Sequence, residues 1–305
     1  MTKMTSPAEL LKRMQDLDLG DSDYDLMLML YGGQGGGKTT TGGAMAQMLT
    51  HNGKIALLDS SDGYVSLRNL PGLTTGVQRI RCKSYSDLYG YAEARSRGIT
   101  GFDHDVVIID ELSSMANDVL DDVVMEKNDN DINAEVDWTY YRPAAQRIMT
   151  VLNKLHDVEG LHVIVVAHQK ATLIRPKPPV NFVSPNFSPK MADRIGQIMH
   201  VVAHCSRIVE GSEKDVSYRF LLQCQLSKLV EAKSRVGGMP TYMEPVDFVG
   251  MIAEWVSSEQ IASDTAAEEA YHEPDEDMLP EGITAIDLNN TEDDNDEPAF
   301  SGPVE

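Results

Sequence analysis

A glycine-rich stretch near the N-terminus constrains this chain more than any other feature. It reads Gly32-Gly-Gln-Gly-Gly-Gly-Lys38-Thr39 and matches the pattern G-x-x-x-x-G-K-T. It lies between an apolar run, Leu26–Tyr31, and a helical stretch, Thr39–Leu49, which is the strand–loop–helix context that this motif requires. Glycines let backbone N–H groups curl around phosphate oxygens, and the helix N-terminus adds positive potential. The stretch therefore predicts a phosphate-binding loop for a nucleoside triphosphate.

The motif assigns a task to each residue type. We expect Lys38 to reach the β- and γ-phosphates and the Thr39 hydroxyl to bind Mg²⁺. The sequence contains no guanine-reading N-K-x-D motif, so ATP is the expected nucleotide. The residues expected to contact ATP in this region are Gly32, Gly33, Gln34, Gly35, Gly36, Gly37, Lys38, Thr39 and Thr40.

A second apolar strand ends in two acidic side chains. Val106–Ile109 is followed directly by Asp110 and Glu111, which is a Walker B pattern. In that pattern the first acid holds Mg²⁺, and the second can act as general base for the attacking water. Two alternatives stay open. Glu111 is a solvated helix cap, or Asp62, after the strand Lys54–Asp59, is the base.

Short apolar runs alternate with helical stretches along the central part of the chain. The expected strands are Asp25–Leu30, Lys54–Asp59, Asp105–Asp110 and His162–Ala167. The expected helices are Thr39–Leu49, Ser86–Ser96, Pro143–His156 and Val246–Val256, and the expected hairpin joins Met199–Val209 to Val216–Cys224. Apolar strands separated by helices predict an α/β fold. We expect a mainly parallel, twisted sheet with helices on both faces and a C-terminal antiparallel hairpin.

Charge divides the chain unevenly. The sequence has 26 Lys and Arg against 48 Asp and Glu, yet residues after Arg235 hold 19 of these acids and no Lys or Arg. The part before that point is nearly neutral, so a local basic surface for nucleic acid stays compatible with the acidic composition. We expect an N-terminal helical arm (1–23), an ATPase core (24–257) and an acidic disordered tail (258–305).

Cysteines and apolar runs bear on the compartment. The three cysteines have no metal-ligand spacing, and the longest apolar runs are far shorter than the ~20 residues of a membrane span. The sequence starts without an apolar signal region. These features predict a reduced, cytoplasmic chain with no membrane partner.

The strand His162–Ala167 is followed by polar and then basic residues. His168 and Gln169 come first, at a place from which they can sense the γ-phosphate. The segment from Lys170 to Lys190 then combines cations with aromatic rings and five prolines. Cations for phosphates and rings for stacking are typical of single-stranded nucleic acid binding, although a proline-rich surface loop is the alternative. The expected DNA-binding residues are Lys170, Arg175, Lys177, Phe182, Phe187 and Lys190.

The order of these motifs resembles the RecA-like core ATPases. Over roughly residues 24–245 it is most similar to the phage single-strand-annealing ATPases of the Sak type. The stretch Glu231–Pro240 is similar to the K-x-R-x-G segment by which RecA-like proteins reach a neighbour's nucleotide. The resemblance therefore implies that Lys233 and Arg235 act catalytically on an adjacent subunit.

The resemblance also implies partners and a function. It implies a homo-oligomeric ring or filament that hydrolyses ATP between subunits with Mg²⁺ and takes single-stranded DNA as partner. We therefore expect a DNA recombination or annealing ATPase, phage-encoded and active in the host cytoplasm, with a single-strand-binding protein considered as a further partner. The alternatives are a replicative helicase or helicase loader, and a regulatory nucleotide-binding switch that does not touch DNA.

Overall fold

The computed structural model describes residues 25–257, except Asn69, Pro71, Asn130 and residues 132–134, 177–178 and 213–214. The expected N-terminal arm and acidic tail lie outside the described residues. No helix in the described part is long and apolar enough to cross a membrane.

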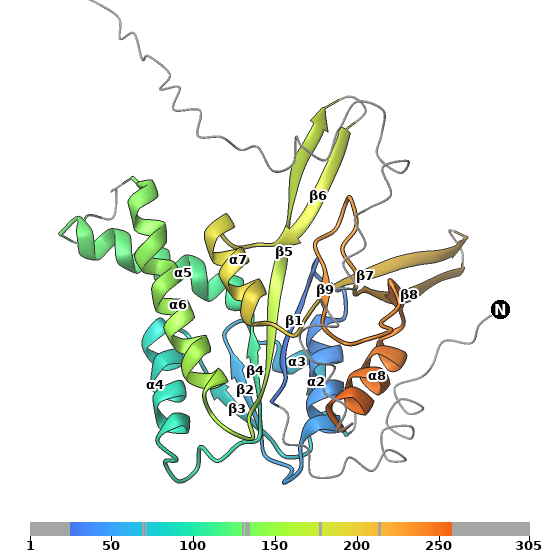
Figure 1. The fold of residues 1–305 in the computed structure, drawn as a ribbon, viewed down its shortest axis with the longest axis horizontal. Helices are drawn as coiled ribbons and strands as arrows, with labels where there is room; N and C mark the ends of the chain where they lie inside the picture. Colours follow the sequence, from blue (N-terminus) through green and yellow to red (C-terminus); the bar gives the residue numbers. More distant parts are fainter. Residues whose placement is uncertain are drawn as a thin grey trace, which may run out of the picture. The chain divides into compact units, whose positions relative to one another are not determined.

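One large sheet organises the described residues (Figure 1). Its strands are β1 (Met27–Gly32), β2 (Ile55–Asp59), β3 (Val77–Arg81), β4 (Val106–Asp110), β5 (His162–Pro176), β6 (Pro179–Pro185), β7 (Val201–Ser212), β8 (Asp215–Gln223), β9 (Lys233–Ser234) and β10 (Tyr242–Met243). The order is β10-β8-β7-β1-β5-β4-β2-β3, and the strands from β7 to β3 run parallel. Because β5 separates β1 from β4, an additional strand lies between the two Walker strands.

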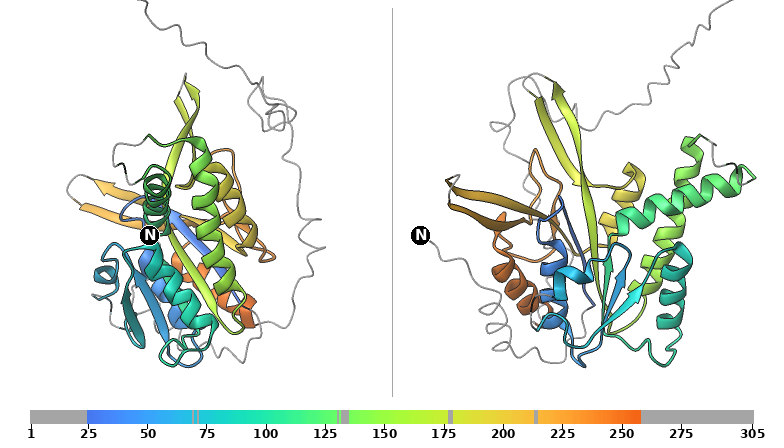
Figure 2. Two further views of the ribbon diagram at one scale, coloured as in Figure 1. Left: turned by 90° about the vertical axis from the view of Figure 1, so that its left-hand side faces the viewer. Right: turned by 180° about the vertical axis from the view of Figure 1, so that it is seen from behind.

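Both faces of the central strands are covered. Every residue of β1, β2 and β4 is buried, as the apolar runs predicted. The side chains of β1 alternate between two cores, with Met29 and Tyr31 on one face and Leu28 and Leu30 on the other. The helices α4 (Tyr85–Ser96), α5 (Leu112–Lys127), α6 (Tyr141–His156) and α7 (Pro189–Ile198) cover the first face, and α2 (Lys38–Leu49), α3 (Tyr64–Arg68) and α8 (Pro245–Ser257) cover the second (Figures 1 and 2). The expected α/β fold class, including the antiparallel pair β7–β8, is confirmed.

The basic segment after Ala167 differs from the expected loop. The strand β5 continues to Pro176 and pairs antiparallel with β6, so most of the segment is a β-hairpin that stands out beyond the sheet (Figure 1). The prolines do not prevent this, because proline is tolerated at strand ends and edges, where no ladder hydrogen bond is lost. Pro176 and Pro179 face each other at the far end of the ladder. We call this element the β5–β6 hairpin.

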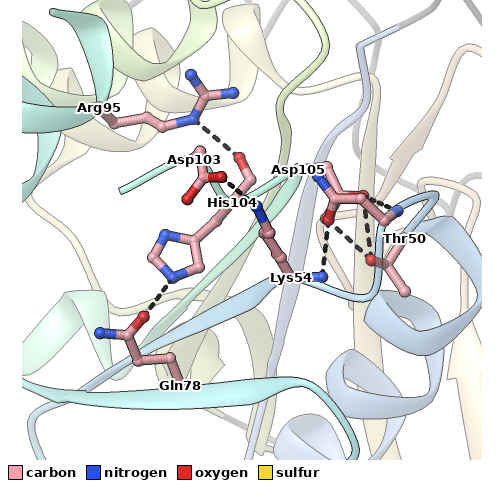
Figure 3. A network of polar contacts seen from close by, with 8 residues as sticks. Thr50, Lys54, Gln78, Arg95, Asp103, His104 and Asp105 are labelled. Carbon is pink, nitrogen blue, oxygen red and sulfur yellow. Dashed lines mark hydrogen bonds and ion pairs between the residues drawn. The ribbon is translucent and has the colours of Figure 1, made fainter. Parts of the chain in front are cut away.

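A polar network closes the edge of the sheet at which β2 and β4 begin (Figure 3). Asp105 accepts hydrogen bonds from the Thr50 hydroxyl (2.9 Å) and from the backbone N–H groups of His51 (2.6 Å) and Asn52 (2.9 Å). Its neighbour His104 contacts Gln78 Oε1 (2.8 Å) through Nε2. These contacts hold the turn after α2 against β4, and we call the group the amino-edge network.

Candidate nucleotide-binding site

The glycine-rich loop joins β1 to α2 as the motif requires. Gly37 adopts a left-handed backbone conformation (φ 84°) immediately before the helix starts at Lys38. The Lys38 side chain is 6% exposed, and its ammonium group donates to the carbonyl oxygens of Gly32 (3.2 Å) and Gly33 (3.1 Å). A buried lysine beside the N-terminus of a helix, with unpaired backbone N–H groups around it, makes a strong anion site.

The residues expected to hold Mg²⁺ meet directly. The Thr39 hydroxyl donates to Asp110 Oδ1 (3.2 Å), while the buried Asp110 Oδ2 has no hydrogen-bond partner among the described residues. Burial, with the charge of Glu111, raises the pKa of the Asp110 carboxyl to about 7. A Cβ at Gly63 would lie 1.5 Å from Oδ2, so only glycine leaves this oxygen room. A buried carboxylate oxygen without a donor fits a divalent cation.

Thr39 and Asp110 are compatible with one common kind of metal site. Within the described ranges, no cluster of three or more His, Cys, Asp or Glu side chains could hold a metal ion. Mg²⁺ commonly binds through one or two protein groups together with substrate phosphates. The pair Thr39 and Asp110 therefore fits a magnesium ion that arrives with a nucleotide.

Glu111 lies inside the site and does not cap a helix from solvent. It precedes α5 in a left-handed conformation (φ 69°) that is strained for a residue other than glycine, and its side chain makes no capping bond. Its Oε1 lies 3.9 Å from Lys38 Nζ, and its Oε2 lies 2.8 Å from His168 Nε2. The interpretation as a solvated cap is thus wrong, since the side chain is 9% exposed.

The other candidate base is placed differently. The Asp62 side chain is 71% exposed and pairs with Arg79 Nη2 at 2.5 Å. The same guanidinium donates through Nε to the buried Asp59 (2.6 Å). Because Asp62 is exposed and already paired with a cation, the geometry favours Glu111 as the base.

The expected sensor residues connect the loop to the neighbouring strands. The His168 backbone N–H donates to the Ser113 hydroxyl (2.9 Å) in α5. Gln169 Oε1 contacts His204 Nε2 (2.8 Å) in β7, and its amide lies 3.7 Å from where a Cβ at Gly33 would be. His168 and Gln169 therefore lie beside Glu111 and the loop, respectively.

The β7–β8 hairpin (Val201–Ser212 and Asp215–Gln223) forms a wall of the loop that the sequence analysis missed. A Cβ at Gly32 or Gly36 would lie 2.1 or 2.9 Å from the Cys205 carbonyl oxygen in β7. A Cβ at Gly35 would meet Arg207 Nη1 at 3.3 Å, and one at Gly37 would meet the Phe220 ring at 3.2 Å. The motif requires glycine only at positions 32 and 37. The additional glycines Gly35 and Gly36 were therefore the one sequence signal that another segment packs closely against the loop.

The expected DNA-binding residues are not all available to DNA. Phe187 is 4% exposed and packs in the core beside α7, which corrects the expectation that its ring stacks on a base. Lys170 is half-buried, and its ammonium donates to the Phe187 carbonyl oxygen. Phe182 is half-buried on β6 opposite Thr172, and Lys190 is exposed in the first turn of α7. The Arg175 side chain and Lys177 lie outside the described part.

Within one chain, the two cations expected to act on a neighbour stabilise the end of α7. Lys233 Nζ donates to the Gly196 carbonyl oxygen (3.0 Å), and Arg235 Nη2 donates to that of Gln197 (3.0 Å). These carbonyls belong to the last turn of the helix, where cations are favourable. Burial and the charge of Arg235 lower the pKa of Lys233.

Comparison with solved structures returns distant likenesses. One is the flagellar accessory protein FlaH from Methanocaldococcus jannaschii, with 12% identity over 70% of this chain and 82% of that chain and a TM-score of 0.37. Another is an ATPase from the type III secretion system of pathogenic bacteria, with 13% identity over 58% of this chain and 50% of that chain and a TM-score of 0.38. Both TM-scores lie below 0.5, and neither likeness bears on function.

Family comparison is more decisive. None of the curated proteins compared with the chain matches it. A family model described as AAA domain (AAA_24) matches residues 25–236, which contain the glycine-rich loop, the Walker B acids and the sensor residues. A P-loop ATPase of this kind binds ATP with Mg²⁺. The chain belongs to the AAA_24 family of AAA domains and is a P-loop ATPase.

Proposed function

We propose that this ATPase couples ATP hydrolysis to single-stranded DNA and acts in strand annealing or recombination, as in the Sak-type proteins that its sequence resembles. The site supplies the hydrolytic chemistry. Lys38 binds the β- and γ-phosphates, and the Glu111 carboxylate accepts the proton of the attacking water. The water oxygen forms a bond to the γ-phosphorus. The bond between the γ-phosphorus and the oxygen of ADP breaks, which gives ADP and phosphate. Mg²⁺, when bound through Thr39 and Asp110, neutralises charge on the phosphates.

The continuity of β5 carries the proposal. The same strand lies between the two Walker strands, presents His168 and Gln169 to the nucleotide site, and then forms the β5–β6 hairpin. A second link comes from β1, where the hydroxyl of Tyr31 lies 3.3 Å from the Val183 carbonyl oxygen in β6. A change at the γ-phosphate therefore has a direct covalent route to a projecting element that carries a half-buried aromatic ring, Phe182.

The test is the rate of ATP hydrolysis with and without single-stranded DNA. We expect stimulation of the wild-type chain and a loss of stimulation in Phe182→Ala, because base stacking contributes about 1–3 kcal/mol. The matched control is Tyr141→Ala, which removes an exposed aromatic ring from α6, far along the sequence from the hairpin. Equal rates with and without DNA in the wild-type chain would contradict the proposal.

A protein-regulated switch is the second candidate, and one observation favours it. Leu173 and Ile174 in the β5–β6 hairpin are 55% and 56% exposed, and two adjacent exposed aliphatic side chains suit a protein contact better than a nucleic acid. This candidate predicts that DNA leaves hydrolysis unchanged, and that Leu173→Ser with Ile174→Ser abolishes binding of a protein partner. Unwinding of a duplex in the presence of ATP would instead identify a helicase.

We propose in addition that the chain works as a homo-oligomer in which Arg235 reaches the nucleotide of a neighbour. The support is the K-x-R-x-G resemblance, and such a cation can contribute ~10³–10⁵ in rate. Mixing tests it, because Arg235→Ala subunits should regain activity when combined with Lys38→Ala subunits. If mixed oligomers form but are inactive at every ratio, Arg235 does not act on a neighbour's nucleotide. Its role would then be the hydrogen bond to Gln197 at the end of α7, and Arg235→Ala should have a lower melting temperature.

A further inference from the structure

One face of the β7–β8 hairpin lies beside the glycine-rich loop. In this antiparallel pair Arg207 lies opposite Phe220, and Val209 lies opposite Tyr218. Residues directly opposite each other, and residues two apart on one strand, share a face of a sheet. Arg207 and Phe220 both lie beside the loop, because a Cβ added at Gly35 would meet the Arg207 guanidinium and one added at Gly37 would meet the Phe220 ring. The hairpin therefore presents a cation and an aromatic ring to the loop from the β7 side.

The Arg207 side chain is exposed and has no ion-pair partner among the described residues. Across the described residues, no carboxylate lies within the 4 Å of an ion pair with its guanidinium. What orients it is the Tyr218 ring, whose centroid lies 4.7 Å from the guanidinium carbon. This cation–π contact fixes direction without neutralising charge. Arg219, on the opposite face of the same hairpin, instead pairs with Glu244 (3.1 Å) and Glu210 (3.9 Å).

The loop beside Arg207 already holds positive charge. The loop already contains the Lys38 ammonium, and the first N–H groups of α2 add the positive end of the helix dipole. Burial, and to a smaller extent the charge of Lys38, lowers the pKa of His204 in β7. A guanidinium held over Gly35 is thus stabilised by a polyanion in the loop, for which its planar N–H groups are suited.

We propose that Arg207 binds the phosphate chain of the nucleotide from within the same chain. This inference rests on the proposed ATPase site and adds to it a cation that neither the motif nor the K-x-R-x-G resemblance supplies. Arg207 is distinct from the proposed neighbour-directed Arg235, since its guanidinium already lies beside Gly35 within one chain. The Tyr218 ring acts as a positioning residue for the guanidinium.

Nucleotide binding by the full chain tests the proposal without turnover and without DNA. A fluorescent ATP analogue with Mg²⁺ reports affinity by anisotropy, and unlabelled ATP and inorganic tripolyphosphate serve as competitors. Arg207→Ala should weaken binding of both competitors about tenfold, the size of a lost charge-assisted hydrogen bond. Arg207→Lys should retain most of the affinity because the charge stays. Arg219→Ala, which removes the same charge from the other face, should bind as the wild-type chain does.

Each other outcome is informative. Wild-type affinity in Arg207→Ala overturns the proposal and leaves the ATPase site intact. A loss for ATP but not for tripolyphosphate also overturns it, because Arg207 would then contact the nucleoside. An equal loss in Arg219→Ala would show a general charge effect and overturn the proposal as well. If the wild-type chain binds neither competitor, the proposed ATPase function fails together with it. Circular dichroism of each variant confirms that the hairpin folds.

Discussion

Buried polar residues lie at both ends of the central parallel strands, at the amino edge where the strands begin and at the opposite edge where they end. The two groups differ in how many of their polar atoms have hydrogen-bond partners. At the amino-edge network, Asp105 accepts three hydrogen bonds from the turn after α2. At the opposite edge, Asp110 keeps an oxygen without a partner among the described residues, and Glu111 has a strained backbone. Buried polar groups with hydrogen-bond partners stabilise the fold. Buried polar groups without partners cost stability, and such groups are typical of sites that bind a ligand. The contrast assigns structure to one edge and chemistry to the other.

The largest expected effect comes from replacing one lysine at each edge and comparing the rates of ATP hydrolysis. Lys38→Ala should abolish ATP hydrolysis, because it removes the buried ammonium that the loop holds beside Gly32 and Gly33 for the β- and γ-phosphates. Lys54→Ala, which breaks the exposed pair with Asp103 at the amino edge, should leave the rate unchanged. Steady-state ATPase assays on both variants make the measurement. Wild-type turnover in Lys38→Ala would remove the loop from the mechanism.

The second effect concerns the base. Glu111→Gln should bind ATP normally and hydrolyse it about 10²–10⁴-fold more slowly, because the amide cannot accept the proton of water. Asp62→Asn is the matched control, since it changes an exposed acid paired with Arg79. Single-turnover hydrolysis measures the chemical step in both. A slow Asp62→Asn beside a fast Glu111→Gln would assign the base to Asp62.

The third prediction is that substitutions of Asp105 and Asp110 have opposite effects on stability and on ATP affinity. Asp105→Ala should lower the free energy of unfolding by about 1–3 kcal/mol, because it removes the buried carboxylate that accepts hydrogen bonds from Thr50 and His51. Its affinity for ATP should not change. Asp110→Asn should do the reverse: without ligands the chain keeps its stability or gains some, and the Mg²⁺-dependent part of ATP affinity is lost. Urea unfolding and nucleotide titration of both variants would show whether this exchange holds.

The last effect, seen only in acid, is a dependence of stability on pH at the start of β5. His162 accepts a hydrogen bond at Nδ1 from the Leu26 backbone N–H (3.0 Å), and burial lowers the pKa of this imidazole to about 4. Between pH 6.5 and 4 the unfolded chain binds a proton that the folded chain does not, so stability falls as the pH falls through this range. The loss amounts to up to about 3 kcal/mol.

The variant His162→Gln tests that dependence. Glutamine keeps an acceptor for the Leu26 N–H but cannot titrate, so melting temperatures at pH 7 and pH 4.5 should differ less than in the wild-type chain. The same slope in both proteins would assign the acid sensitivity to other groups.

Local sequence was enough to find the parts of the site that one strand and one loop make. The loop, Asp110 and Glu111 were predicted because apolar runs, glycines and carboxylates stand next to one another in the chain. The edge strand β3 was not predicted, since its sequence Val-Gln-Arg-Ile-Arg is half exposed and lacks the apolar character of β2 and β4. Burial, which made the central strands visible, is weak at the edge of a sheet.

Features that depend on packing between distant segments were not predictable. An apolar ring such as Phe187 reads the same in the sequence whether it faces DNA or the core beside α7. Arg207 is separated from the loop by most of the domain, and only the register of β7 beside β1 brings the two together. The extra glycines Gly35 and Gly36 recorded this contact, but they did not name the segment that fills the space.

The length of β5 has a mechanical consequence. Beyond Ala167 the strand runs on to Pro176, which at about 3.3 Å per residue makes an arm of roughly 30 Å. Its base is clamped between β1 and β4, while its outer half is paired only with β6. A tilt of about 5° at Gln169 would shift the outer end by roughly 2 Å. An arm of this length would amplify a displacement at its base, so a spin label at Leu173 is expected to report nucleotide binding at a distance from the reacting atoms.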